Sequence, residues 1–517
     1  MSSTELRLES QTPGKSSRTL AATDALLLVV IAALMTLLHL LTNARYGFHR
    51  DELQFLSDGR HLDWGYVVYP PFTPLLARLS LTIFGPSLVG LRLLSDLAQG
   101  LAIILTGLMA RDLGGRRLAQ VAAGLAVALS PISIHCGTQF IYTSFDYLWW
   151  VLTAWLLIRL LNTGKPHWWL AIGAALGVGL MTKYTIGAFV VGILGAFLFP
   201  EDRRCFRSRW FWAGVCVALG MVLPNVLWQF QHQFISLHWM HAVHDRDVRM
   251  GRADGFVLQQ FFVSVNIFAA PLWIVGGLTC LRSPGYRRLR PLAWAFLISF
   301  AILLLMRARP YYLAPAFPML IAVGAARSEQ WLSKLRQSQG RTVMIAYFSL
   351  LGAYALLAMV YLVPLAASGP IRKFALAHNW DFREEIGWEQ LVKTVASVRD
   401  ALPESTRSGA KVLVRNYGEE GAIELYGAAY QLPTPMGGAN SAWLRGYPDP
   451  PPTTLIVVGV EPEEGRRWFT SCYVAARVRN SEGIPNLESE SIRSSILVCG
   501  PPRSPWPVFW REFRNFG

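Results

Sequence analysis

Long apolar segments separated by short polar loops occupy residues 21–364 of the 517-residue chain. A helix needs about 20 mostly apolar residues to cross the hydrocarbon core of a bilayer. The stretches 167–199 and 291–327 are each broken by only a few polar residues, so each holds two segments that are short for a span. The pattern predicts eleven spanning helices, at 21–42, 87–109, 117–136, 143–161, 167–182, 185–199, 210–229, 256–281, 291–306, 311–327 and 342–364.

Residues 365–517 have a different pattern, in which short apolar stretches alternate with polar ones. Helices are expected over 384–400 and 418–430, and strands at 411–415, 455–459, 473–479 and 493–499. We therefore expect an α-helical polytopic membrane protein with a C-terminal α/β domain. The expected divisions are a tail at 1–20, a membrane domain at 21–364 with outer loops 44–86 and 230–255, and an outer domain at 365–517.

The composition narrows the class of protein. The chain is 53% hydrophobic and 16% charged, with a formal net charge of +15, whereas soluble domains carry about 25% charged residues. These values exclude a disordered chain and a small disulfide-stapled one, and they disfavour a simple soluble enzyme. A basic excess fits nucleic acid, an anionic membrane or lipid phosphates as the partner.

The position of the basic residues along the chain selects among these partners. Cytoplasmic loops of membrane proteins carry an excess of Lys and Arg. The loops 200–209 and 282–290 hold eight arginines between them, and both lie inside only if all eleven spans cross. The charge thus orients the helices, with the N-terminal tail in the cytoplasm and the C-terminal domain outside, and nucleic acid is not an expected partner.

A few cations lie instead at outer helix ends. Arg92, Lys183 and Arg309 are such residues, and an ionisable group at membrane depth is a functional-site hypothesis. Their expected ligand is the phosphate of a lipid. For Arg92, an ion pair with Asp96 one turn along the same helix is the alternative.

Carboxylates gather on the same outer face. Asp51 and Glu52 follow the first span, at the start of an expected short helix, and Asp146 lies at the outer end of the fourth span. A solvated loop is the alternative explanation for the first pair. Together, acids suited to base chemistry and cations suited to phosphate point to a reaction site.

Two further groups of residues are candidates for a metal site and for a disulfide. His238, His241 and His244 in the second outer loop could ligate zinc, although an amphipathic helix at the membrane surface also explains their spacing. Cys472 and Cys499 lie in the outer domain, where the oxidising compartment would permit a disulfide between them.

The order of these motifs resembles the membrane glycosyltransferases of the C superfamily. More narrowly it is similar to glycosyltransferase family 39 and to the bacterial dolichyl-phosphate-mannose-protein mannosyltransferase-like proteins, with the lipid A aminoarabinose transferases as relatives. The motifs that carry the resemblance are His49-Arg-Asp51-Glu52, Gly65-Tyr66 with Pro70-Pro71, Thr143-Ser-Phe-Asp146, Met181-Thr-Lys183-Tyr184, Arg309-Pro-Tyr-Tyr312 and Asn416-Tyr-Gly418.

The resemblance implies transfer of a sugar from a polyprenyl phosphate to an acceptor at the outer face, with inversion. It implies Asp51 as the general base beside Glu52, and Asp146 near one of the two sugars. The expected phosphate ligands are Arg92, Lys183 and Arg309, and the expected residues near the sugar or acceptor are His49, Tyr66, Tyr311 and Tyr312.

Elementary chemistry is consistent with this assignment. Transfer from a phospho-sugar passes through an oxocarbenium-like state, and the leaving phosphate needs cations more than a proton donor. A hydroxyl acceptor requires a carboxylate base, whereas a phosphate acceptor does not, and the sequence leaves both open. No cofactor is required, although a divalent metal is compatible with the site.

The expected partners are a polyprenyl-phosphate sugar, membrane lipids and an acceptor lipid, glycan or protein, at the periplasmic face of a bacterial inner membrane. A lipid transporter or flippase is the main alternative, but transporters usually contain internal repeats, and the sequence shows no matching halves. A non-catalytic lipid-binding scaffold would not need both Asp51 and Asp146.

Overall fold

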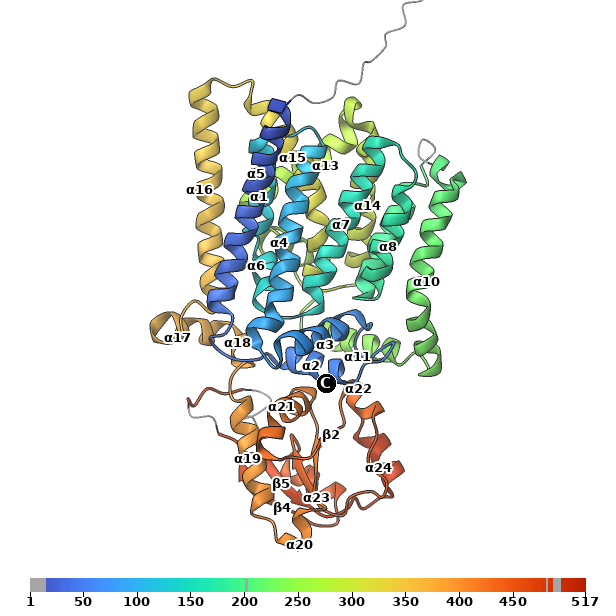
Figure 1. The fold of residues 1–517 in the computed structure, drawn as a ribbon, viewed down its shortest axis with the longest axis vertical. Coiled ribbons are helices and arrows are strands. Elements are labelled where there is room, and N and C mark those ends of the chain that lie inside the picture. The colour runs from blue at the N-terminus through green and yellow to red at the C-terminus, as the bar shows by residue number, and fades with distance from the viewer. Residues whose placement is uncertain (1–14, 200–202, 480–481, 487–493) are drawn as a thin grey trace, which may run out of the picture.

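The computed structural model describes residues 15–199, 203–479, 482–486 and 494–517. It consists of a helical bundle, a layer of short helices at one end of the bundle, and an α/β domain beyond that layer (Figure 1). The bundle contains α1 (Lys15–Thr42), α4 (Leu88–Asp112), α5 (Arg117–Ala128), α6 (Pro131–Thr138), α7 (Tyr142–Thr163), α8 (Trp168–Leu180), α9 (Gly187–Ala196), α10 (Arg209–Gln231), α12 (Phe256–Phe262), α13 (Ala270–Arg282), α14 (Arg290–Leu305), α15 (Phe317–Leu332) and α16 (Gln337–Leu362).

The bundle is that of a multi-pass membrane protein. Within the described residues, six helices are long and apolar enough to cross a bilayer, and the bent pairs α5–α6 (60°) and α12–α13 (92°) bring the number to eight. Each of the eleven predicted segments coincides with a helix or a bent pair, but α8, α9 and α15 are short, so eleven crossings remain a prediction. The N-terminal end of α1 and the C-terminal domain lie at opposite ends of the bundle, as an odd number of crossings requires (Figure 1).

The layer between the bundle and the domain combines helices of the predicted outer loops with two helices that follow the last bundle helix. It contains α2 (Arg50–Arg60), α3 (Phe72–Phe84), α11 (Ile235–Arg249), α17 (Gly369–His378) and α18 (Trp380–Arg383) (Figure 1). The helix α2 begins with a capping box, in which the His49 side chain accepts from the Asp51 N–H and the Glu52 carboxylate accepts from the His49 N–H. This cap fixes the backbone that carries Asp51.

The C-terminal domain is built on a five-stranded sheet of order β2-β1-β3-β5-β4. Strands β2, β1 and β3 are parallel, and β5 and β4 are antiparallel to their neighbours. The prediction of an α/β domain is confirmed, although the two-residue strand β2 was not predicted. The elements are α19 (Trp388–Asp400), α20 (Glu404–Arg407), β1 (Lys411–Val414), α21 (Tyr417–Tyr426), β2 (Met436–Gly437), α22 (Asn440–Leu444), β3 (Leu455–Val458), α23 (Pro462–Trp468), β4 (Cys472–Arg477), β5 (Ser495–Cys499) and α24 (Trp506–Phe513).

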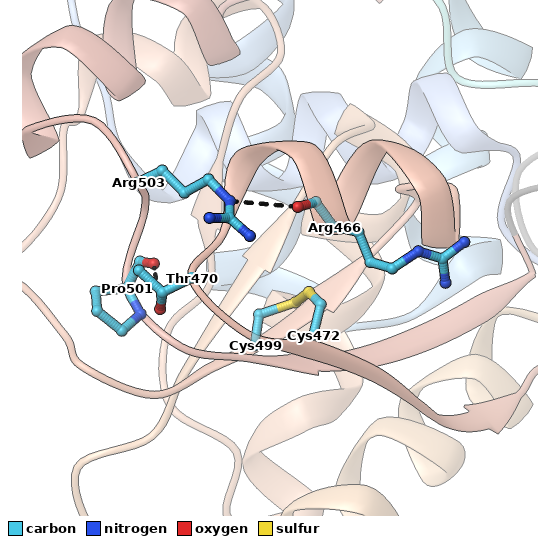
Figure 2. Close-up of a disulfide and its surroundings, with 6 residues drawn as sticks. All are labelled: Arg466, Thr470, Cys472, Cys499, Pro501 and Arg503. Carbon is cyan, nitrogen blue, oxygen red and sulfur yellow. Dashed lines mark hydrogen bonds between the residues drawn. A yellow bond between two sulfur atoms is a disulfide. The ribbon is translucent and has the colours of Figure 1, made fainter.

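A disulfide joins Cys472 and Cys499, the two cysteines paired in the sequence analysis (Figure 2). The two residues lie opposite each other on β4 and β5. The bridge therefore fastens the edge strand of the sheet to its buried neighbour.

The C-terminal domain packs directly onto α2. Gly421 of α21 lies so close to this helix that a Cβ there would be 2.4 Å from the Leu53 carbonyl oxygen. Leu53, Phe55 and Leu56 belong to the same buried apolar cluster as Ile423 and residues of the sheet. Since α2 also carries Asp51, the contact places this carboxylate at the junction of bundle and domain.

Candidate active site

Two adjoining cavities lie at this junction. The first, of about 470 Å³, is lined by charged and polar side chains of α2, α11 and the C-terminal domain, and we call it the polar cavity. The second, of about 480 Å³, is lined mainly by apolar side chains of α9, α11 and α14, and we call it the apolar cavity. They share the side chains of Tyr69, Tyr142, Arg309 and Tyr312, so the two spaces meet at one wall.

Asp51 lines the polar cavity, and about a third of its side chain (35%) is exposed. Its Oδ1 accepts a hydrogen bond from the Tyr417 hydroxyl at 3.0 Å, and the Arg50 Nε lies 3.7 Å away. Burial raises the pKa of Asp51, but His49, Arg50 and the hydrogen bond from Tyr417 outweigh it and hold this pKa below its ordinary value. The carboxylate is therefore ionised at neutral pH and open to the cavity.

The apolar cavity faces the outside of the bundle. Ala188 and Val191 of α9 and Leu303 of α14, with Met306 just after it, contribute its apolar wall. Val191 and Met306 are 52% and 63% exposed, so the cavity opens through the side of the bundle formed by α9 and α14. An acyl or isoprenoid chain could therefore enter this cavity from the membrane without crossing water.

Lys183 lies at the wall of the apolar cavity within a cage of three tyrosine rings. Its Nζ is 4.1 Å from the ring centroid of Tyr312, 4.7 Å from that of Tyr142 and 5.3 Å from that of Tyr311. The same Nζ donates to the Thr143 hydroxyl at 3.3 Å. Aromatic faces attract an ammonium group, so the cage fixes a positive charge at this point.

Arg309 lines both cavities and is held by an aspartate. Its Nε and Nη2 donate to the two carboxylate oxygens of Asp247 at 2.6 and 2.9 Å. Arg252 also donates to Asp247, at 3.1 Å. Asp247 lies three residues after the last histidine of the second outer loop, but its sequence position alone does not reveal that it orients Arg309.

Arg92 and Glu52 do not lie at either cavity. They form a bidentate ion pair, with both nitrogen–oxygen distances at 2.8 Å, and each side chain is 1% exposed. Glu52 also accepts from the backbone N–H groups of His49 and Phe140, and Arg92 also donates to the carbonyl oxygens of Asn43 and Gly47. This geometry indicates a structural pair that joins α2 to α4, and it argues against phosphate binding by Arg92 and against a reacting role for Glu52.

The alternative expected for Arg92, a pair with Asp96 in the next turn, is also not what the structure shows. The ion pairs of Arg92 are with Glu52 and Glu385. The partner comes from α2, which lies far away in sequence, so helical spacing within α4 could not identify it.

Three other predicted residues lie behind the cavity wall. Asp146 is buried, and its carboxylate accepts hydrogen bonds from the Trp150 Nε1 at 3.1 Å and from the Thr185 hydroxyl at 3.0 Å. The bond from Thr185 stabilises the turn that carries Lys183. The Tyr66 hydroxyl forms hydrogen bonds with backbone atoms of the last turn of α2 and of the loop that follows it. His49 caps α2.

The three histidines of the second outer loop have exposed side chains on α11, and one of them, His244, also borders the apolar cavity. Nowhere in the described residues do three His, Cys, Asp or Glu side chains group so as to hold a metal ion. Because α11 lies in the layer between bundle and domain (Figure 1), its position agrees with the alternative of an amphipathic helix at the membrane surface.

Sequence reasoning did not assign a role to several residues that line these cavities. Tyr142 is the residue before the Thr143–Asp146 motif, and Tyr417 lies within the Asn416–Gly418 motif. Both motifs are among those that carry the family resemblance, so the sequence did point to these two regions. Which side chain of each motif faces the cavity depends on helix phase and on the docking of the C-terminal domain.

Comparisons with known proteins agree with this architecture. Residues 68–228 match the family described as dolichyl-phosphate-mannose-protein mannosyltransferase. An undecaprenyl phosphate-alpha-4-amino-4-deoxy-L-arabinose arabinosyl transferase of Pseudomonas fluorescens is 26% identical over 309 residues, which are 56% of this chain and 51% of the relative. The corresponding transferase of Pseudomonas savastanoi is 23% identical over 59% of this chain and 60% of its own. This chain thus spans about half the length of the curated relatives it matches.

Solved structures extend the likeness in fold to almost the whole chain. ArnT from Cupriavidus metallidurans bound to undecaprenyl phosphate has a TM-score of 0.56 at 16% identity, covering 92% of this chain and 98% of that one. Its apo form has a TM-score of 0.54 at 15% identity. The resemblance to the C-superfamily membrane glycosyltransferases of the mannosyltransferase type, predicted from the sequence motifs, is therefore confirmed.

Proposed function

We propose that this protein is a membrane glycosyltransferase that moves a sugar from a polyprenyl-phosphate sugar to an acceptor at the periplasmic face of a bacterial inner membrane. One observation carries the proposal. An apolar cavity that opens through the side of the helical bundle and a polar cavity with an ionised carboxylate share a wall that contains Arg309, close to the caged Lys183. The names of the curated relatives, and the undecaprenyl phosphate bound to the ArnT of similar fold, support the same donor class.

The apolar cavity suits the lipid part of the donor. Its wall between α9 and α14 would receive the first isoprene units, because apolar surface is stabilised by contact with apolar surface. The phosphate would then lie beside Lys183 and Arg309. The Lys183 ammonium has three N–H donors, and the Arg309 Nη1 is not used in the pair with Asp247.

Both cations would act on the leaving group. As the bond between the sugar C1 and the phosphate oxygen breaks, negative charge grows on the phosphate, and fixed cations in a partly dry site stabilise that growth. Asp247 keeps Arg309 in place, and the tyrosine cage does the same for Lys183. Neither group needs to move during the reaction, which is the benefit of a preorganised site.

Asp51 would act on the acceptor from the polar cavity. A hydroxyl acceptor would lose its proton to the Asp51 carboxylate while its oxygen bonds to C1 on the face opposite the phosphate, so the product is inverted. The low pKa of Asp51 keeps the carboxylate in the ionised form that this role requires. No cofactor takes part in this scheme.

The proposal is tested with purified protein in detergent, a set of polyprenyl-phosphate sugars, and an extract of bacterial envelope lipids and glycans as the source of the acceptor. We expect release of free polyprenyl phosphate from at least one donor, and loss of that release in Lys183→Ala but not in Lys165→Ala, a lysine of an inner loop. Equal release by both variants would remove Lys183 from the reaction. Tight binding of undecaprenyl phosphate with every donor left intact would favour a lipid carrier instead.

A further inference from the structure

A cavity of about 700 Å³ lies at the end of the bundle opposite the candidate active site. It is enclosed by the start of α5, the end of α15, the first turns of α16 and the loop between α15 and α16, far from the C-terminal domain (Figure 1). Arg116, Arg336 and Arg341 line this space, and we call it the distal cavity. Among the described residues it shares none with the polar or the apolar cavity, so it is a separate site.

The three arginines of the distal cavity are free to bind an anion. Within the described residues, none of their guanidinium groups forms a hydrogen bond or an ion pair. One carboxylate, that of Glu329, is among the residues that line the cavity. Its oxygens accept hydrogen bonds from the backbone N–H groups of Arg116, Leu118 and Ala119. Glu329 thus caps the N-terminus of α5, and it forms no ion pair with the guanidinium groups.

The distal cavity lies at the expected depth of lipid headgroups. The helix α16 is long and apolar enough to span a bilayer, and Arg341 comes two residues before its mostly apolar stretch begins at Val343. From Val343 to Leu362 a helix extends about 30 Å, which is the thickness of the hydrocarbon core. Val343 and Ile345 are 40% and 57% exposed. An amphiphile with its charged group at Arg341 could therefore lay its chains along this side of α16.

We infer that the distal cavity binds the phosphate group of an anionic phospholipid. Guanidinium groups bind phosphate through paired N–H donors, and basic pockets between membrane helices recognise anionic headgroups. A lipid fits better than a soluble phosphate because Leu332, Leu335 and Met344 also line the cavity and give it an apolar side. In the proposed orientation this end faces the cytoplasm, so the lipid belongs to the inner leaflet and is distinct from the sugar donor.

The bound lipid would fasten α16 to the rest of the bundle. Gly340, Leu351 and Ala355 are the buried residues of this 26-residue helix, so most of its surface has no protein neighbour. A phosphate bonded to Arg116 before α5 and to Arg341 of α16 would connect the two helices. Because a ligand that binds only the folded state stabilises it, the lipid should also raise the unfolding temperature.

The test uses full-length protein in detergent and native mass spectrometry, which counts the lipids that stay bound. The probes are phosphatidylglycerol, which is anionic, and phosphatidylcholine with the same acyl chains, which is zwitterionic. Arg336 and Arg341 are changed together to Ala, or together to Lys so that the charge is kept. The matched control is Lys165→Ala with Lys334→Ala, which removes the same charge from exposed lysines at the same end that do not line the cavity. Lys183→Ala reports on binding at the donor site.

We expect the wild type to bind phosphatidylglycerol at least tenfold more tightly than phosphatidylcholine. The double change to Ala should weaken phosphatidylglycerol binding at least fivefold, the double change to Lys should keep most of it, and the lysine control and Lys183→Ala should change it less than twofold. A wild type without preference would overturn the inference, as would an equal loss in the lysine control or a loss in Lys183→Ala. Displacement of the lipid by an equal concentration of inorganic pyrophosphate would overturn the lipid as the ligand. None of these results depends on sugar transfer.

Discussion

Arg92 and Glu52 face each other across the junction of α4 and α2, with the Nε and Nη2 atoms of the arginine each 2.8 Å from a carboxylate oxygen. The pair is almost fully buried, and it anchors the first turn of α2 one residue after Asp51. The position of the proposed base thus depends on an ion pair that does not touch the cavities.

Replacing one partner of this pair should destabilise the protein. Arg92→Leu leaves the Glu52 carboxylate buried without its main counter-charge, at a cost of about 3–5 kcal/mol. Thermal unfolding in detergent should show a clear loss of stability for Arg92→Leu, and Arg78→Leu, at an exposed arginine of α3, is the matched control. If Arg92→Leu were as stable as the wild type and bound only undecaprenyl phosphate less well, Arg92 would be a phosphate ligand after all.

We expect the rings of the tyrosine cage, and not their hydroxyl groups, to hold Lys183 in position. Lys183→Ala should weaken the binding of undecaprenyl phosphate at least tenfold, because it removes a charge-assisted contact. Tyr312→Phe keeps an aromatic face over the ammonium and should bind almost normally, whereas Tyr312→Ala should not. Equal affinities of the Phe and Ala variants, measured by calorimetry, would show that the ring does not position Lys183.

The contact between α2 and the C-terminal domain should weaken as the pH rises. Arg445 pairs with both Asp58 and Glu420 there. Burial raises the pKa of Asp58 from 3.8 to about 6, although Arg445 and the hydrogen bond from Tyr69 act in the opposite direction. Burial also raises the pKa of Glu420, to about 8. A carboxyl group with a higher pKa in the folded state takes up protons on folding, so the free energy of unfolding falls as the pH rises from about 4 through these values.

This pH dependence is measured as the unfolding midpoint of the wild type and of Asp58→Asn between pH 5 and pH 8. The variant lacks one of the titrating groups, so its midpoint should fall less steeply with pH than that of the wild type. Parallel curves would show that Asp58 does not titrate in this range.

The disulfide should contribute to the stability of the outer domain. Cys472 and Cys499 are 27 residues apart, and closing a loop of that length stabilises the folded state by about 3.5 kcal/mol in the chain-entropy model. The double change to serine should lower the denaturant midpoint by a corresponding amount, while Cys216→Ser, at an exposed cysteine of α10, should not. Alkylation of both Cys472 and Cys499 without reductant in protein taken from the membrane would contradict the bridge.

The sequence predicted the elements better than the contacts between them. Apolar length and β-branched runs located the bundle helices and four of the five strands, because these signals are local. The sequence motifs predicted Arg92, Glu52 and Asp146 at the reaction site, but Arg92 and Glu52 pair with each other from distant segments. Asp146 is held by Trp150 one turn along the same helix and by Thr185 from a distant segment. By contrast, the sequence predicted no role for Asp247 or Tyr417. Only the tertiary contacts place Asp247 beside Arg309 and Tyr417 beside Asp51.

Asp51 is the residue on which the proposed transfer depends most, and one comparison tests it directly. Transfer from the preferred polyprenyl-phosphate sugar is measured for the wild type, for Asp51→Asn and for Asp245→Asn, which removes an exposed carboxylate of α11. Loss of a general base typically costs a factor of about 10² to 10⁴ in rate, so we predict a fall of at least about a hundredfold for Asp51→Asn, with undecaprenyl phosphate binding unchanged. A transfer rate in Asp51→Asn equal to those of the wild type and Asp245→Asn would contradict the assignment of this cavity as the site of transfer.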